Sequence, residues 1–500
     1  MKAEIFSALD WIVVISLLLL MIMVGFFSSK KNKDKKDYVL GGKKMNSTMV
    51  GISLFATLFS TLSYLAYPGE MIKYGPVFFT GLIAFPVAAW IVGRFLIPRF
   101  MKMNVTSAYE ILEIKLGKGT RNLATAFFLT LRFLWMATLV YATVDTALIP
   151  IFGFSKVYVP LISIVLTLIT VLYTTMGGLK AVVITDVLQS AIMFLGVILT
   201  IAIIVVKIGS VKAFFNPELF TNWSPMDFSI DATKRMTVGN IFIMTLLWQV
   251  CTSGSDQMAI QRYLSTKDTK TACRSYYISL ISSGSIQILL AIVGLVVLTY
   301  FYYNPNMMQP GTTIFNDADT LFPRFILIGM PSGVTGLIAA AIMAAAMSSL
   351  SSGLNSSSTV IHEDIIHRLR KRKTEDSKDG MNNIKKISAV LGVVIAFSCY
   401  FISYVSGNLL DVVIKVSNLV VAPLFVLFFM ALFISCSTNR GTIIGGFFSL
   451  FVAILIAFFG IFNITAIWVM PLSLIAGVII SIIFSLLDRK FIIHRIYEKS

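Results

Sequence analysis

The sequence is poor in the residues on which most catalytic and metal sites depend. Its 500 residues include three histidines and four cysteines, and only 13% of them are charged. The histidines all lie in charged segments at the ends of predicted helices: His362, His367 and His494. The cysteines are scattered in or beside apolar segments: Cys251, Cys273, Cys399 and Cys436. Neither set has zinc-ligand spacing or the density of a disulfide scaffold, so both of these protein classes are excluded.

Nucleotide-driven and enzymatic functions also lack their sequence signals. No phosphate-binding GxxxxGK[ST] motif is present in the sequence. No acid and base lie at a workable spacing, and no nucleophile is arranged around a histidine. We therefore predict that the chain is not an enzyme, that it needs no cofactor, and that any transport it carries out is driven by a gradient.

Apolar residues, in contrast, are abundant. They make up 57% of the chain, the mean hydropathy is +0.85, and runs of near 20 apolar residues recur. The sequence therefore predicts an all-α polytopic membrane protein. Hydropathy places about 13 transmembrane helices at about 9–28, 46–67, 74–98, 122–150, 158–176, 181–206, 237–256, 275–303, 325–365, 386–405, 409–434, 441–461 and 465–488. The first is expected to remain as a true span and not to be a cleaved signal peptide.

The basic residues predict the topology. With the N-terminus outside, cytoplasmic segments carry about 31 of the 41 Lys and Arg, and outer segments carry about 8. The N-terminus is therefore expected outside and the C-terminus inside. The net charge of +17 resides largely in "KKNKDKK" and "RLRKRKTEDSK", which are typical of cytoplasmic anchors on anionic lipid, so we expect no binding to nucleic acid.

Two predicted spans are interrupted by polar and small residues. The first reads "LFATLFSTLSYLAYPGE" (Leu54 to Glu70), and the second reads "WQVCTSGSDQMAIQRYL" (Trp248 to Leu264). Unwound backbone at membrane depth survives only where it is buried in protein or lines a polar cavity. Each interruption opens a block of five spans, which is typical of an inverted-repeat transporter with substrate between the breaks. For the second, the alternative is a helix end or a close helix contact.

A face of small residues and hydroxyls runs along the predicted span in "AAAIMAAAMSSLSSGLNSSS". Ala345, Ser348, Ser349, Ser352 and Ser356 recur there at three- and four-residue spacing. A sodium ion takes about five or six hard oxygen ligands, which hydroxyls and unwound carbonyls supply. The alternative is a packing seam of small residues, for which alanine alone would suffice.

An acid, Asp186, lies within the apolar stretch of "YTTMGGLKAVVITDVLQ". Because an intramembrane acid is costly, it indicates a functional site. It completes a cation site with Ser351 and Ser352, takes up a proton, or caps a helix end. Other charges have partners that the sequence does not reveal: Glu70, Arg132, Asp145, Asp411 and Lys415.

Six motifs, in order over about 37–365, resemble the sodium:solute symporter family. They are "DYVLGGKKM", "FATLFSTLSYLAYPGE", "TSAYEILEIKLG", "YTTMGGLKAVVITDVLQ", "SDQMAIQRYL" and "AAAIMAAAMSSLSSGLNSSS". The resemblance implies the leucine-transporter fold, with a five-plus-five inverted repeat. It divides the chain into an N-terminal helix and basic loop (1–45), a first repeat (46–210), a second repeat (211–435) and two C-terminal helices with a basic tail (436–500).

The resemblance also implies two ion sites. The family's conserved sodium site maps onto the backbone carbonyls of Ala56, Phe59 and Ala345 and the hydroxyls of Ser348 and Ser349. A second sodium, held by some members such as the bacterial sialic acid transporters, maps onto Asp186, Ser351 and Ser352. Every required side chain is present.

The substrate residues match the family less closely. The resemblance to the sialic acid branch places the hydroxyls of Ser60, Thr61 and Ser63 at a substrate carboxylate. Two departures are that Trp135 stands where those transporters carry an arginine, and Leu82 where they carry a glutamine. "PGEMIKYG" is also similar to the monocarboxylate and vitamin branch. An aromatic set either stacks on a sugar ring and gates the cavity, or only packs: Phe78, Phe79, Trp135 and Trp248.

We therefore predict a sodium-coupled symporter of a small polar organic solute, of the sialic acid, sugar or carboxylate class, that works by alternating access. We expect a monomer in the cell membrane, which for a bacterial-type member is the inner membrane. One alternative is a proton-coupled symporter that uses Asp186. Another is a solute sensor of the same fold, which the short tail "RKFIIHRIYEKS" disfavours.

Overall fold

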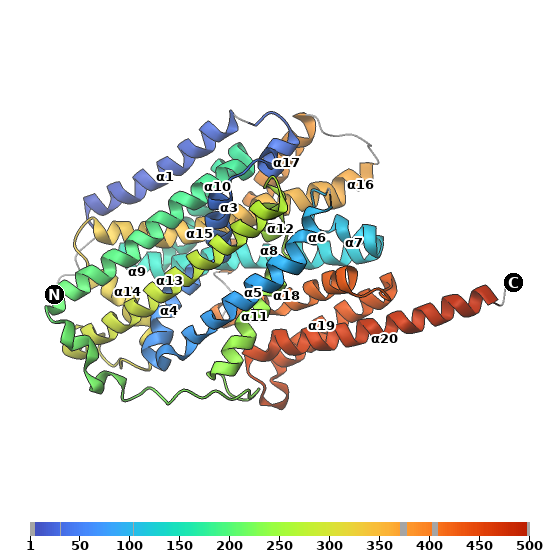
Figure 1. Cartoon of the computed structure of the whole chain (residues 1–500). Helices are drawn as coiled ribbons and strands as arrows, with labels where there is room; N and C mark the ends of the chain where they lie inside the picture. The colour runs from blue at the N-terminus through green and yellow to red at the C-terminus, as the bar shows by residue number, and fades with distance from the viewer. Residues whose placement is uncertain (1–5, 31, 104, 371–377, 403–408, 498–500) are drawn as a thin grey trace.

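The computed structural model describes residues 6–30, 32–103, 105–370, 378–402 and 409–497. Regular structure in these residues is helical, and most helices run roughly along one long axis (Figure 1). Helix α1 (Ala8–Ser29) begins at one end of this axis, and α20 (Val469–Tyr497) ends at the other. Opposite ends are what an odd number of spans requires, in agreement with the predicted thirteen.

The other helices of the membrane bundle follow in chain order. They are α3 (Ser47–Leu58), α4 (Thr61–Tyr74), η2 (Gly75–Ile83), α5 (Ala84–Ile91), η3 (Val92–Leu96), α6 (Ile97–Met101), α8 (Lys118–Thr143), η4 (Val144–Leu148), α9 (Ile149–Phe152), α10 (Val159–Ile208), α11 (Val238–Ser255), α12 (Gln257–Leu264), α13 (Thr269–Tyr303), α15 (Val334–Val360), η9 (Ile361–Ile366), α17 (Lys378–Ile402), α18 (Leu409–Phe433) and α19 (Asn439–Phe459). Shorter helices outside it are α2 (Lys35–Leu40), α7 (Glu110–Lys115), α14 (Ala318–Gly329) and α16 (His367–Arg370).

Among the described residues, nine helices are long and apolar enough to cross a membrane. One of these nine helices contains α10, which has 50 residues and is long enough for two spans. It turns at Gly178, whose φ of 61° and ψ of −157° are not helical, and so contains the two spans predicted at 158–176 and 181–206. Only glycine adopts this φ without strain, which explains the "GG" in the sequence.

The span predicted over 325–365 is present but begins later than expected, since the candidate membrane helix runs from Val334 to Ile366. The chain forms α14 and then α15, with a non-helical connection from Met330 to Gly333. Pro331 follows Met330 in this connection and has no N–H for a helical bond, and Gly333 has a φ of +86°, so these two residues separate α14 from α15.

Both predicted helix interruptions are present. Phe59 and Ser60 are extended between α3 and α4, and the Ser60 hydroxyl caps α4 by accepting from the Ser63 N–H at 3.2 Å. Pro68 and Gly69, which the sequence offered as further breakers, lie inside α4. The second break is the single extended residue Asp256 between α11 and α12, whose carboxylate caps α12 by accepting from the Met258 N–H at 2.9 Å.

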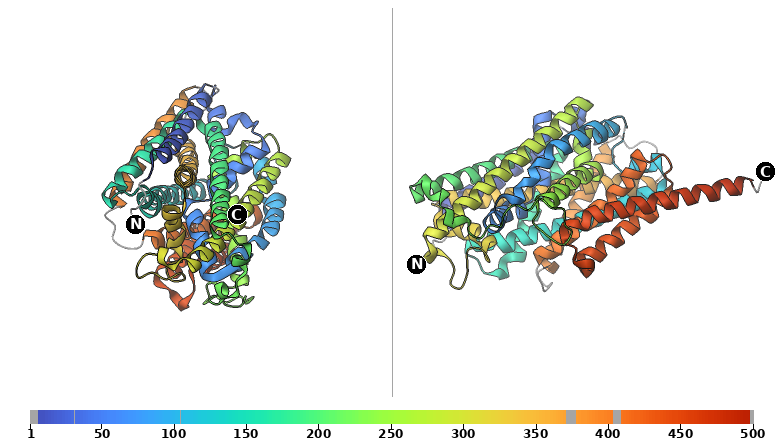
Figure 2. Two further views of the ribbon diagram at one scale, coloured as in Figure 1. Left: turned by 90° about the vertical axis from the view of Figure 1, so that its left-hand side faces the viewer. Right: turned by 60° about the horizontal axis from the view of Figure 1, so that its bottom comes forward.

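Helix α15 lies at the centre of the bundle. Every residue from Ile338 to Val360 is buried, and α15 packs against α1, α8, α10 and α17. Its serine face is therefore turned to protein on all sides and not to lipid. The trailing helices α19 and α20 lie together along one side of the bundle (Figure 2).

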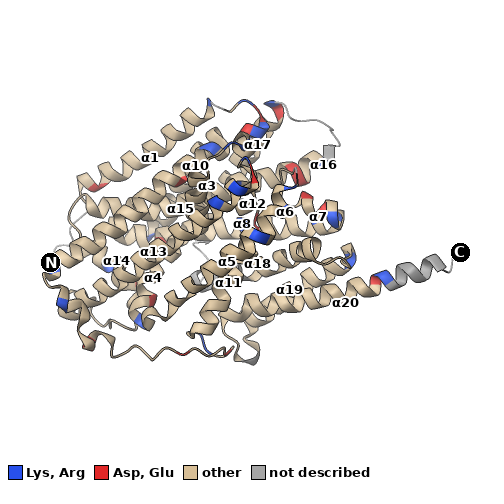
Figure 3. Ribbon diagram, in the orientation of Figure 1, with Lys and Arg blue, Asp and Glu red and all other residues tan. Residues whose placement is uncertain are grey.

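Charge is distributed unevenly along the bundle. Lys and Arg gather around α7, α12 and α17, toward the end at which α20 terminates (Figure 3). Basic residues concentrate on the cytoplasmic side of membrane proteins, so this arrangement agrees with the predicted topology.

Candidate ion and substrate sites

The serine face of α15 meets the end of α3 at the first break. The Ser349 hydroxyl donates to the backbone carbonyl of Thr57 at 3.3 Å, and the hydroxyls of Ser352 and Thr57 are 2.9 Å apart. Carbonyls in the last turn of α3 lose their usual helical partners because the chain is extended at Phe59 and Ser60. Neutral oxygens from two helices thus converge on one buried place.

The two serines of the predicted first sodium site have different hydrogen-bond partners. Ala56, Phe59 and Ala345 are buried beside it. Ser349 faces the break, whereas the neighbouring Ser348 hydroxyl donates to Asp186 at 2.6 Å. Ser348 therefore connects the first predicted site with the second.

Asp186 is completely buried in the second half of α10. It accepts hydrogen bonds from Ser53 at 2.5 Å and from Ser348, and it forms an ion pair with Arg262 at 3.1 Å. The alternative in which the acid caps a helix end near the cytoplasm does not match this position, since Asp186 bonds to side chains of three other helices, α3, α12 and α15.

Arg262 is the counter-charge that sequence reasoning missed. Its guanidinium donates to Ser53 at 2.9 Å and to Ser352 at 2.5 Å, in addition to Asp186. The signal for it was present: a buried acid needs an opposite charge, and Arg262 follows the second break by six residues in a helix that is buried throughout. Its place in "SDQMAIQRYL" suggested only a cytoplasmic charge.

The second predicted sodium site is brought together in part. Asp186 and Ser352 both contact the Arg262 guanidinium. The Ser351 hydroxyl donates to the Ser348 carbonyl of its own helix at 3.0 Å, and no direct bond joins it to Asp186 among the described residues. Ser53 and Thr57 of α3 are closer participants in this polar cluster than the sequence indicated.

The second break is held by charged and amide groups. Asp256 forms a buried ion pair with Arg132 of α8. The neighbouring Gln257 accepts from the Ala108 N–H at 2.7 Å and donates to the Thr106 carbonyl at 3.3 Å. The Arg132 Nε is buried and has no hydrogen-bond partner among the described residues, so this guanidinium keeps an unused donor.

The predicted substrate residues divide into two groups. Ser60 and Ser63 lie at the start of α4 with their hydroxyls 3.2 Å apart, and the Phe78 ring of η2 lies 5.0 Å from the Tyr67 ring of α4. Thr61 is turned away, since it donates to the Ile342 carbonyl of α15 at 3.3 Å.

The other two predicted substrate residues, Leu82 and Trp135, are half-buried. Leu82 lies beside Gly284 of α13, and Trp135 lies on α8 one turn beyond Arg132. The structure does not bring Leu82 to the first break through any contact described here.

Two of the remaining charges have partners near the membrane surfaces. Glu70 pairs with Arg235 at 2.5 Å and Asp145 pairs with Lys156 at 3.3 Å. The side chains of Asp411 and Lys415 lie outside the described part of the structure.

Comparison with known proteins adds independent evidence. The model of the sodium:solute symporter family matches residues 38–448. The sodium/sialic acid symporter SiaT of Proteus mirabilis is 29% identical over 468 residues, which cover 92% of this chain and 91% of that protein. The sodium-coupled monocarboxylate transporter 1 of Xenopus laevis is 29% identical over 457 residues, 88% of this chain and 70% of its own.

Solved structures agree with these relatives. The substrate-bound outward-open state of a Na+-coupled sialic acid symporter superposes with a TM-score of 0.86 at 27% identity, covering 96% of this chain and 98% of that chain. A closed state of Mhp1, a nucleobase-cation-symport-1 family transporter, has a TM-score of 0.55 at 10% identity, covers 91% and 94% of the two chains, and shows the shared fold alone.

These matches span most of the chain, and the observed fold agrees with them. The resemblance seen in the sequence is confirmed, and the leucine-transporter fold with it. The protein is a multi-pass membrane transporter and not an enzyme, and sodium is its coupling ion. The chain belongs to the sodium:solute symporter family and catalyses sodium-coupled symport of a solute.

Proposed function

We propose that the first sodium ion binds where α15 meets the end of α3. Its ligands are the backbone carbonyls of Ala56, Phe59 and Ala345 and the hydroxyls of Ser348 and Ser349. The observation that carries this proposal is the Ser349 contact with the Thr57 carbonyl, which sets an α15 hydroxyl against the last turn of α3, directly before the extended residues Phe59 and Ser60. Unwound carbonyls at a half-helix end are the usual sodium ligands in transporters of this architecture.

Ser348 has two tasks that are chemically compatible. A hydroxyl has one donor and two acceptor lone pairs. Ser348 donates its proton to Asp186, so its lone pairs are left for a cation. The negative charge of Asp186 then stabilises the first sodium through a single hydroxyl, although it is not one of the first site's ligands.

A second sodium is proposed at Asp186, Ser351 and Ser352, and it competes with Arg262. The guanidinium already supplies a positive charge to Asp186 and a donor to Ser352. Two cations do not share one buried carboxylate without a large repulsion, because charges close together in a low-dielectric interior interact strongly. The second sodium therefore binds only when Arg262 withdraws, and with it α12.

The substrate is proposed to be a small organic carboxylate held between the two breaks. Arg132 supports this proposal: it is a buried cation at the second break with an unused Nε donor, and arginine binds carboxylates well. The relatives transport sialic acid or monocarboxylates, which share that group. The start of α4, with Ser60 and Ser63, offers further donors to an anion. Trp135, in place of the arginine of the sialic acid branch, argues for a different member of the carboxylate class.

Sodium and substrate are proposed to help each other bind. Sodium at the first site joins α15 to the end of α3 and thereby orders the chain at Phe59 and Ser60, where α4 begins. A substrate that contacts α4 then meets an ordered site. By linkage, bound substrate raises the affinity for sodium by the same factor by which bound sodium raises the affinity for substrate.

Uptake into proteoliposomes tests these assignments. The probes are a sialic acid, pyruvate, pantothenate, glucose, myo-inositol and proline, each with an inward sodium gradient and a matched potassium control. We expect a carboxylate without an amino group to accumulate only with sodium. Accumulation of glucose or myo-inositol alone would overturn the carboxylate proposal, and uptake that follows protons in the absence of sodium would overturn the proposed ion sites.

A further inference from the structure

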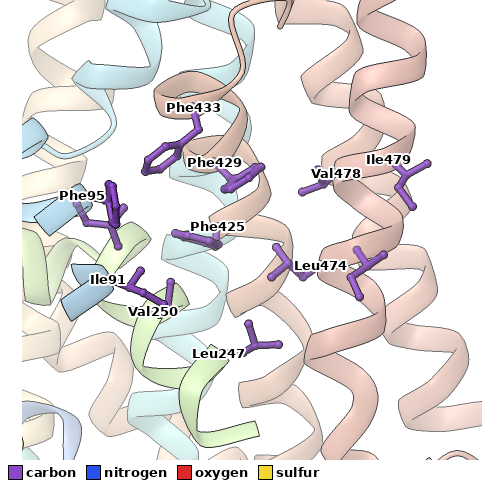
Figure 4. A pocket seen from close by; sticks show the side chains of 12 residues that line it. Ile91, Phe95, Leu247, Val250, Phe425, Phe429, Phe433, Leu474, Val478 and Ile479 are labelled. Atoms are coloured by element: carbon purple, nitrogen blue, oxygen red, sulfur yellow. The ribbon is translucent and has the colours of Figure 1, made fainter. Parts of the chain in front are cut away.

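An apolar cleft outside the transport sites is open to the bilayer. It lies between α11, α18, α20 and the segment Ile91–Leu96, and its volume is about 430 Å³ (Figure 4). All twelve residues that line it are hydrophobic, and none of its surface is polar. Two of its residues on α20, Ile475 and Ile479, are 54% and 51% exposed, so one side of the cleft faces lipid.

The shape of the cleft follows the direction of a lipid tail. Phe425, Phe429 and Phe433 lie at four-residue spacing along one face of α18, and Leu474 and Val478 do the same on α20. Eight residues of helix span about 12 Å, and the hydrocarbon of one leaflet is about 15 Å thick. The cleft therefore follows α18 and α20 over a length similar to the thickness of one leaflet.

Two arginines each contact the chain near the end of the cleft where α18 terminates. The Arg99 guanidinium lies 4.5 Å from the centre of the Phe433 ring. The Arg489 guanidinium donates to the Ser435 carbonyl at 2.6 Å, two residues farther along the chain. Neither arginine forms an ion pair with a carboxylate among the described residues, so both retain donors for an external anion. With the predicted topology, this end lies at the cytoplasmic surface, where anionic lipids attract basic residues.

We propose that this cleft binds a membrane phospholipid with an anionic head group. One acyl chain occupies the apolar cleft, and the phosphate lies between Arg99 and Arg489. Two features together favour a phospholipid over a neutral apolar ligand. The cleft is apolar and about as long as one leaflet is thick, and two basic side chains lie near its end. A neutral ligand would use the cleft but would bring no anion to the two guanidinium groups.

The bound lipid would contact the half-helix that leads to the second break. Leu247 and Val250 of α11 line the cleft, and Asp256 follows Val250 by six residues. At Gly254, a Cβ would lie 2.5 Å from the Phe425 ring, so α11 approaches α18 closely between the cleft and the break. A lipid in the cleft therefore packs against α11 and opposes its movement away from α18.

The test measures lipid binding directly. Purified, delipidated protein in detergent is titrated with dioleoyl phosphatidylglycerol or dioleoyl phosphatidylcholine, and bound lipid is counted by native mass spectrometry. We expect the wild-type protein to bind phosphatidylglycerol more tightly. Arg99→Gln with Arg489→Gln should weaken that binding by about 30-fold. Each basic residue near an anionic lipid surface contributes about 1 kcal/mol of binding free energy, and about 1.4 kcal/mol corresponds to tenfold in affinity.

Two further variants separate the head group from the tail. Arg274→Gln with Lys267→Gln removes two exposed charges at the same membrane side, away from the cleft, and should bind phosphatidylglycerol as the wild type does. Leu474→Trp fills the cleft and should reduce the binding of both lipids. Equal binding of both lipids by the wild type, unchanged binding by the arginine pair variant, or unchanged binding by Leu474→Trp would each overturn the proposal. The surface variants keep the test valid if Leu474→Trp does not fold.

Discussion

Both broken helices are interrupted by one or two extended residues, but the groups around the two breaks differ in charge. At the first break, neutral hydroxyls and carbonyls of α3, α4 and α15 face one another, as in the Ser349 contact with Thr57. At the second, the ion pair of Asp256 with Arg132 and the amide of Gln257 tie the break to α8 and to residues 106–108. A neutral cradle suits a small cation that must bind and leave, whereas a fixed guanidinium suits an anion.

Arg262 joins these two regions. It belongs to α12, directly after the second break, and it bonds to Ser53 of α3, before the first. Its ion pair with Asp186 is buried completely. Movement of α12 therefore changes the charge around the proposed sodium sites, and this is a physical route by which the substrate side and the ion side of the transporter are coupled.

The largest effect on stability is expected when the ion pair of Asp186 with Arg262 is removed. Asp186→Asn leaves the Arg262 charge buried and unpaired, which costs roughly 3–5 kcal/mol of stability. The double variant Asp186→Asn with Arg262→Gln removes both charges and should recover much of that loss. Thermal unfolding in detergent measures both. If the single and double variants are equally stable, the ion pair does not join the two regions.

The double variant also tests the second sodium site. With neither Asp186 nor Arg262 charged, the second ion has no carboxylate, and the number of sodium ions moved with each substrate should fall by one. The ratio is read from the substrate gradient that a known sodium gradient balances. A ratio equal to that of the wild type would show that Asp186 is structural.

The next effect concerns the neutral break. Ser348→Ala with Ser349→Ala removes two hydroxyls from the proposed first sodium site and keeps the helix. Hydrogen-bond-like contacts to charged groups are worth about 1.5–3 kcal/mol each, so the sodium concentration for half-maximal uptake should rise at least tenfold. Ser356→Ala is the matched control, because within the described residues the Ser356 hydroxyl bonds only to the Ser352 and Gly353 carbonyls of its own helix. Equal sodium activation in all three proteins would contradict the site.

A smaller effect is expected at the charged break. Arg132→Lys keeps the charge but loses the planar fork of donors that matches a carboxylate. The KM for substrate should rise by about tenfold with little change in sodium dependence, measured as uptake at saturating sodium. Loss of sodium activation in this variant, with substrate affinity unchanged, would mean that the division of tasks between the two breaks is wrong.

The smallest effect is expected far from both breaks. Glu70 and Arg235 pair at the outer end of α4, where the Arg235 side chain is 50% exposed and the Glu70 side chain is 16% exposed, so water reaches one partner of the pair. Exposed pairs contribute about 1 kcal/mol or less, and salt screens them. Glu70→Gln should therefore lower the unfolding temperature slightly at low salt and hardly at high salt. A large loss of uptake would indicate that this pair has a part in transport.

Much of the fold was determined by the sequence itself. Within the described residues, hydropathy places the predicted spans on helices except near the start of 325–365, where Met330 to Gly333 separate two helices. The agreement arises because a chain in lipid must satisfy its backbone hydrogen bonds within each segment. Gly178 and the serines of α15 were likewise recognisable, since a positive φ and a hydroxyl face are properties of local residues. The non-helical segment at the first break is shorter than the sequence indicated. Pro68 and Gly69 lie within α4, where Gly69 packs against Asp319.

Only the tertiary structure decided which distant polar groups are partners. Asp186 lies 76 residues from Arg262, and Arg132 lies 124 residues from Asp256. Ser348 and Ser349 are adjacent in sequence, yet one contacts Asp186 and the other contacts Thr57. A sequence shows that a buried charge needs a counter-charge, because an unpaired charge is costly in a low-dielectric interior. Which of several candidates satisfies that need depends on how the helices pack, and no local pattern carries that information.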